Sequence, residues 1–105
     1  MFRLLNGIFL VVVFISVISL VIAIAQTAEE YYDKGITKHE LGDHKGAIQD
    51  YNKAIELNPN DADGYLNRGL AKMNLGQKDS GCLDLSKAGE MGLSQVYDLI
   101  KKYCQ

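Results

Sequence analysis

Two stretches of the chain repeat each other at an offset of 34 residues: AEEYYDKGITKHELGDHKGAIQDYNKAIELNPND at 28–61 and ADGYLNRGLAKMNLGQKDSGCLDLSKAGEMGLSQ at 62–95. Self-similarity at one spacing of this length is typical of stacked repeats, in which each unit buries its apolar face against its neighbour. Ten aligned positions are identical, and they decide the fold. These pairs are Ala28/Ala62, Tyr31/Tyr65, Gly35/Gly69, Lys38/Lys72, Leu41/Leu75, Gly42/Gly76, Asp50/Asp84, Lys53/Lys87, Ala54/Ala88 and Glu56/Glu90.

Each unit is predicted to contain two helices. Tyr65, Gly69 and Met73 recur every four residues, which is a helical spacing. Gly76 follows the last apolar residue of that helix, and glycine is the usual residue just past a helix C-terminus. Pro59 ends the first unit because proline cannot continue a helix. The predicted helices span 27–41, 44–57, 61–75, 78–91 and 94–103.

The two units resemble the tetratricopeptide repeat, whose 34-residue pattern is W-x₂-L-G-x₂-Y…A-x₃-F…P. The first unit matches with Tyr31 in the Trp place and with Gly35, Ala47, Tyr51, Ala54 and Pro59. The second matches with Tyr65, Gly69, Gly81, Leu85 and Ala88, but has Leu93 in the final Pro place. The resemblance implies an all-α, short helical-hairpin solenoid with repeats at 28–61 and 62–95 and a capping helix at 94–103. Four basic residues depart from the apolar pattern: Lys34, Lys38, Arg68 and Lys72.

Residues 1–25 differ from the rest, because 20 of them are apolar and only Arg3 is charged. The apolar run is about as long as the ~20 residues that cross a bilayer. Its end, Ala23-Ile24-Ala25, fits the small-x-small pattern that signal peptidase reads. Two interpretations therefore stay open: a signal peptide cleaved between Ala25 and Gln26, or a membrane anchor retained through residues 4–25. Both predict export of residues 26–105 to the periplasm or the exterior, since a basic residue precedes the span and an acidic segment follows it.

Residues 26–105 carry 10 basic and 13 acidic side chains. This negative balance argues against nucleic-acid binding, which depends on clustered Lys and Arg. The chain shows no phosphate loop or nucleophile motif, so we expect no enzymatic activity and no cofactor. His39 and His44 are five residues apart and lack the i, i+4 spacing of a helical metal pair, so they are predicted to be ordinary surface histidines without a metal.

Cys82 and Cys104 are candidates for a disulfide. Each lies about ten to twelve residues from the turn near Gly92, so antiparallel helices would return both to the same end of the hairpin. An exported protein lies in a compartment where disulfides persist. The alternative is that Cys82 fills the buried position that Ile48 fills in the first unit, and that Cys104 belongs to a frayed end.

The resemblance also implies a concave groove, lined by the first helix of each unit, that receives a peptide or a helix of a protein partner. The chaperone-tail clamp of some family members is not expected, because Tyr32 and Ile36 occupy its Lys and Asn places. The same strip could instead be buried by self-association into a homo-oligomer. The groove residues expected from the repeat positions are Tyr32, Ile36, His39, Glu40, Leu66, Asn67, Leu70, Met73 and Asn74.

Overall fold

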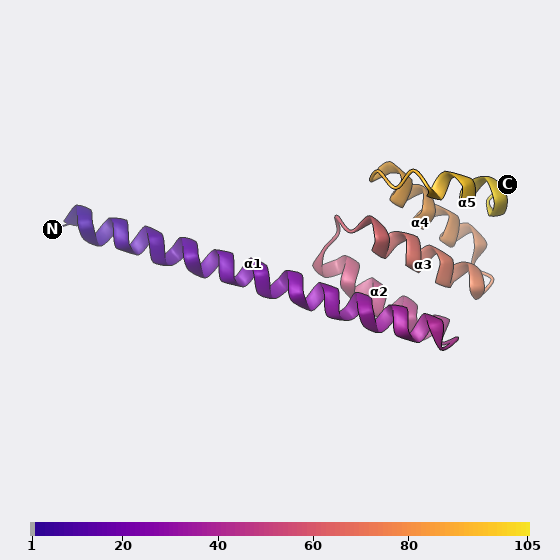
Figure 1. The fold of residues 1–105 in the computed structure, drawn as a ribbon, viewed down its shortest axis with the longest axis horizontal. Coiled ribbons are helices and arrows are strands. Elements are labelled where there is room, and N and C mark those ends of the chain that lie inside the picture. The colour runs from indigo at the N-terminus through magenta and orange to yellow at the C-terminus, as the bar shows by residue number, and fades with distance from the viewer. Residues whose placement is uncertain (1) are drawn as a thin grey trace.

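A computed structural model describes residues 2–105, with side chains from Leu5 onward (Figure 1). Met1 and the side chains of Phe2, Arg3 and Leu4, which begin the predicted leader, lie outside the described residues. Within residues 2–105 the elements are all helices, which confirms the predicted all-α fold. They are α1 (Phe2–Glu40), α2 (His44–Leu57), α3 (Ala62–Asn74), α4 (Lys78–Glu90) and α5 (Val96–Tyr103).

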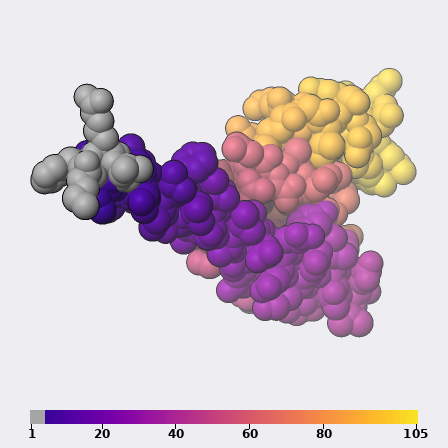
Figure 2. All heavy atoms as spheres, turned by 60° about the vertical axis from the view of Figure 1, so that its left-hand side comes forward, coloured from indigo at the N-terminus to yellow at the C-terminus, as the bar shows by residue number. Residues whose placement is uncertain are grey.

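Helix α1 joins the apolar leader to the first repeat without a break. The prediction of a separate helix at 27–41 was therefore wrong about where the helix begins, because α1 already begins at Phe2. Nothing between Ala25 and Ala28 interrupts a helix, and the Thr27 hydroxyl donates to the Ala23 carbonyl one turn earlier at 2.9 Å. The leader packs against nothing, as Phe14 illustrates with 67% exposure. It stands out from the repeats as a rod (Figure 2), and the molecule is 67 Å long but only 17 Å thick.

The same turn closes both helical hairpins. Gly42 has φ 84° and Gly76 has φ 79°, a left-handed conformation that glycine adopts without steric cost. The N–H of Asp43 donates to the Lys38 carbonyl at 2.8 Å, and the corresponding bond 34 residues later is 2.9 Å long. Asp43 also accepts the Gly46 N–H at 2.9 Å and so caps α2. Repeated turn residues thus produce repeated hairpins.

The core of the first repeat is built around Tyr51, which is 1% exposed between α1 and α3. Ala47 and Ala71 complete the buried cluster, and Tyr32 packs against it with ring centroids 5.9 Å apart. The Tyr51 ring occupies the space above Gly35, where an added Cβ would lie 2.6 Å from Cε1. The Gly and Tyr positions of the repeat are therefore one packing unit.

Burial raises the pKa of Tyr51 to about 12, with smaller contributions from Tyr32 and Glu40. Because this value exceeds the ~10 of an unfolded tyrosine, the neutral phenol stabilises the fold below pH ~10, and this is lost as the pH rises toward 12. We expect about 2–3 kcal/mol of unfolding free energy to disappear over that window. Tyr51→Phe should lose less stability there, measured by circular dichroism against pH. Identical alkaline midpoints for both proteins would contradict this.

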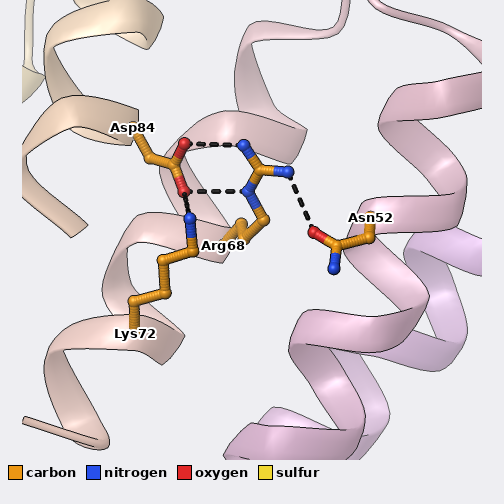
Figure 3. Close-up of polar contacts among 4 residues, drawn as sticks. All are labelled: Asn52, Arg68, Lys72 and Asp84. Carbon is orange, nitrogen blue, oxygen red and sulfur yellow. Dashed lines mark hydrogen bonds and ion pairs between the residues drawn. The ribbon is translucent and has the colours of Figure 1, made fainter. Parts of the chain in front are cut away.

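Ion pairs between the paired helices explain three of the four basic residues that depart from the apolar repeat pattern, Lys38, Arg68 and Lys72. In the first repeat Lys38 Nζ lies 2.8 Å from Asp50, and in the second Lys72 Nζ lies 2.8 Å from Asp84. Arg68 adds a second cation on Asp84, donating from Nη2 at 2.7 Å and Nε at 2.8 Å (Figure 3). Asp50 is half-buried.

Arg68 also connects the two repeats. Its third nitrogen, Nη1, donates to Asn52 Oδ1 of α2 at 2.9 Å, so one guanidinium joins α2, α3 and α4 (Figure 3). The planar fork of arginine permits this, whereas the single ammonium of lysine does not. The network therefore fixes the second repeat against the first.

Helix α5 packs on α4 and is joined to it covalently. Val96 is fully buried, and the Cys82 and Cys104 sulfurs form a disulfide with Cα atoms 5.8 Å apart. The bond closes a loop of 22 residues, which constrains the unfolded chain by about 3 kcal/mol. The predicted capping helix is present, and its last residue, Tyr103, is 43% exposed.

Candidate peptide-binding groove

The first helices of the two repeats meet along one polar contact. The amide of Asn67 on α3 donates to the hydroxyl of Tyr32 on α1 at 2.7 Å and to the Asp63 carbonyl at 3.0 Å. Tyr32 and Asn67 were both predicted to line the groove, and both are half-buried. The pair therefore fixes the spacing of α1 and α3 on this face of the molecule.

A hollow of about 390 Å³ opens where the end of α1, helix α3 and helix α5 converge. Its apolar wall comes from Leu70 and Met73 on α3 and from Leu99 on α5. Four of its residues, on α1 and α3, were predicted from the repeat positions. The lining residues are His39, Leu70, Met73, Asn74, Leu99 and Tyr103.

A second hollow of about 360 Å³ continues from the first, because Met73 and Tyr103 line both. Lys78 of α4 and Lys102 of α5 add two positive charges there, beside the terminal residue Gln105. Together the two hollows form a trough with an apolar start and a basic end. We call this surface, lined by the residues of both hollows, the groove.

The remaining predicted residues lie at or beyond the edge of this groove. Ile36 is half-buried and packs against the core around Tyr51. Leu66 is half-buried on α3, and Glu40 is exposed as the last residue of α1. None of these three lines the two hollows, so the structure brings together only part of the predicted set.

The contribution of α5 to the groove was missing from the sequence prediction, which gave residues 94–103 only as a capping helix. A signal was available, since a third period of 34 aligns Leu99 with Tyr65 and Tyr103 with Gly69. In the repeats those positions pack on the second helix of the unit. No second helix follows α5 in the described chain, so the side chains face the hollow instead.

Two ionisable groups at the apolar end of the groove, Tyr32 beside it and His39 in its wall, are shifted toward their neutral forms. Burial raises the pKa of Tyr32, and the carboxylates of Asp63 and Asp61 raise it further. Burial also lowers the pKa of His39, with a smaller effect from the neighbouring His44. Neutral donors and acceptors beside apolar side chains suit non-covalent recognition of a peptide rather than acid–base chemistry.

The comparisons with known proteins agree with the repeat architecture. A family model described as TPR repeat matches residues 35–76, which span the end of α1, all of α2 and all of α3. A search of curated proteins finds no significant match to the chain. The matched segment contains the Gly35 packing position, the first hairpin turn and the four residues that line the groove from α1 and α3, which are His39, Leu70, Met73 and Asn74.

Proposed function

We propose that the groove binds a segment of a partner protein. Residues 35–76 match the TPR repeat, and such repeats generally act as non-catalytic modules that bind other proteins. Recognition is non-covalent and rests on burial of apolar side chains of the segment against Leu70, Met73 and Leu99. The single observation that carries this proposal is the hollow of about 390 Å³ shared by three alternate helices of the solenoid, α1, α3 and α5.

The size of the groove supports modest affinity. A standard interface buries about 800 Å² on each partner, which is more than two adjoining hollows on a five-helix chain supply. Burial of one leucine-sized side chain contributes about 1.5–3 kcal/mol. A short extended or helical segment with one or two apolar anchors is therefore the partner that fits best.

We also propose that the repeats, taken as residues 26–105, work outside the cytoplasm. The segment from Leu5 is long and apolar enough to cross a membrane, with a mean hydropathy of 3.3 in its most apolar window. The disulfide supports an oxidising compartment, since such bonds are rare in reducing cytosol. Whether residues 1–25 are a cleaved signal peptide or a retained anchor is decided by the mass of the native protein.

The groove is tested by selecting peptides from a random displayed library against the full chain in lipid nanodiscs. The selected peptides should bind Leu70→Gln at least about tenfold more weakly, because this change removes an apolar wall of the hollow. Leu83→Gln is the matched control, since Leu83 is 72% exposed on α4 and lies outside the groove.

Equal binding to the Leu70→Gln and Leu83→Gln variants would contradict the groove assignment. Self-association is the competing function. It is favoured by the apolar leader and by the apolar wall around Leu70 in the groove, which a second copy of the chain could cover. Sedimentation of the full chain at several concentrations separates the two. A stable oligomer that no longer binds the selected peptides would favour the structural role.

A further inference from the structure

The two histidines of the chain lie in contact across the first hairpin turn. His39 sits in the last turn of α1 and His44 is the first residue of α2. Their Nδ1 atoms are 3.3 Å apart, and their ring centroids are 4.7 Å apart. Both side chains are half-buried, and their contact was not anticipated when they were predicted to be ordinary surface histidines. Reversal of the chain at Gly42 brings them together, which linear spacing on one helix did not reveal.

This contact requires that at least one of the facing nitrogens carries no proton, because two N–H groups would point at each other. Burial lowers the pKa of His39 and so favours the neutral ring, which is the form that binds metals. A neighbouring carboxylate, Glu40, lies close enough to favour a positive charge at this place. When the ring that holds the Nδ1 proton takes its other neutral tautomer, with the proton on Nε2, both Nδ1 atoms are unprotonated beside a negative group.

The spacing of the two nitrogens matches the bite of a tetrahedral metal ion. Zinc binds imidazole nitrogen at about 2.0–2.1 Å, so nitrogens 3.3 Å apart subtend roughly 105–110° at the metal. We propose that His39 and His44 form a two-histidine Zn²⁺ site through their Nδ1 atoms. Within the described residues no group of three or more His, Cys, Asp or Glu side chains forms a metal cluster, so water completes the coordination.

The proposed ion would lie at the edge of the groove, because His39 lines the first hollow. Its water-occupied positions are exchangeable, and a carboxylate or imidazole of a bound segment could replace them. The site would also join the last turn of α1 to the first turn of α2. Zn²⁺ should therefore stabilise the first hairpin as well as add a polar contact to the groove.

The test is calorimetric titration of ZnCl₂ into the full chain in lipid nanodiscs, after treatment with chelator. One Zn²⁺ should bind per chain, and His39→Gln and His44→Gln should each weaken binding more than about tenfold, since one imidazole cannot chelate. Lys45→Gln, next to the pair and exposed, is the control and should bind as the natural chain does. Circular dichroism verifies that each variant keeps its helices.

Nitrogen NMR of the unsubstituted chain gives a second measurement that needs no variant. With Zn²⁺ bound at Nδ1, both imidazoles should carry their proton on Nε2, whereas the metal-free pair holds a proton between the Nδ1 atoms. Failure to take up Zn²⁺, equal uptake by the histidine variants, or coordination through Nε2 would each overturn the proposal. None of these outcomes depends on peptide binding, so the groove can be correct when this site is not.

Discussion

Asp84→Ala should destabilise the repeats by about 3–5 kcal/mol, which is the usual cost of leaving buried charges without their partner. Asp84 is 6% exposed and holds two cations, Arg68 and Lys72, whose side chains are only 17% and 15% exposed. Without the carboxylate both cations lose their counter-ion inside the packed helices. Because small domains have only about 5–15 kcal/mol of stability, the second repeat should lose most of its folded population on mild heating.

The first repeat provides the matched control for this experiment. Asp50 occupies the equivalent position but pairs with Lys38 alone, whose side chain is 41% exposed. Solvent screens such a pair, so Asp50→Ala should cost only about 1 kcal/mol. Thermal unfolding followed by circular dichroism would compare the two variants in the same nanodisc preparation. Losses of equal size would show that the Asp84 network does not have the special role assigned to it here.

Gly81→Ala should lower the thermal midpoint by roughly 10 °C, corresponding to a net loss of about 2 kcal/mol for a domain of this size. A methyl group at position 81 would lie 2.8 Å from the Gly69 carbonyl oxygen and 2.9 Å from Met73 Cγ. The first neighbour is backbone, so α3 and α4 must move apart. Overpacking of this kind costs about 1–3 kcal/mol or more, which exceeds the ~0.5–1 kcal/mol that alanine contributes to helix stability.

Gly7→Ala is the control for the helix-propensity contribution. An added Cβ at Gly7 meets nothing within 4 Å, and the residue lies within α1 as Gly81 lies within α4. Its substitution should leave the unfolding midpoint of the repeats unchanged. Gly69→Ala, which enters the same contact from the opposite helix, should behave like Gly81→Ala. A Gly81→Ala protein as stable as the Gly7→Ala protein would show that the two helices can separate freely.

The hairpin order was predictable from the sequence because its signals are local. Gly42 and Gly76 mark left-handed turns, Pro59 ends a helix, and the period of 34 relates the units. The start of the first repeat helix was not predictable in the same way. The helix was predicted to begin at residue 27, just after Ala23-Ile24-Ala25, which fits a signal-peptidase site. These three residues include none that stops a helix, so the helix continues through them.

The groove was harder to predict because it depends on the positions of helices relative to one another. Repeat positions identified His39, Leu70, Met73 and Asn74, but the tilt of the short helix α5 determines that Leu99 and Tyr103 join them. The ion pairs could have been anticipated, since an identical Lys and an identical Asp recur in both repeats. Arg68 could not be assigned to Asn52 without the stacking of α2 on α3.

The unbroken course of α1 has a mechanical consequence for any form of the protein that keeps its leader in a bilayer. Only two residues, Gln26 and Thr27, lie between Ala25, at the end of the apolar run, and Ala28, which is already buried in the bundle. That distance is about 4.5 Å of rigid helix, with no swivel. The tilt and rotation of the membrane-spanning segment would then set the direction in which the groove faces and its height above the lipid headgroups. The bilayer would in this way orient the groove.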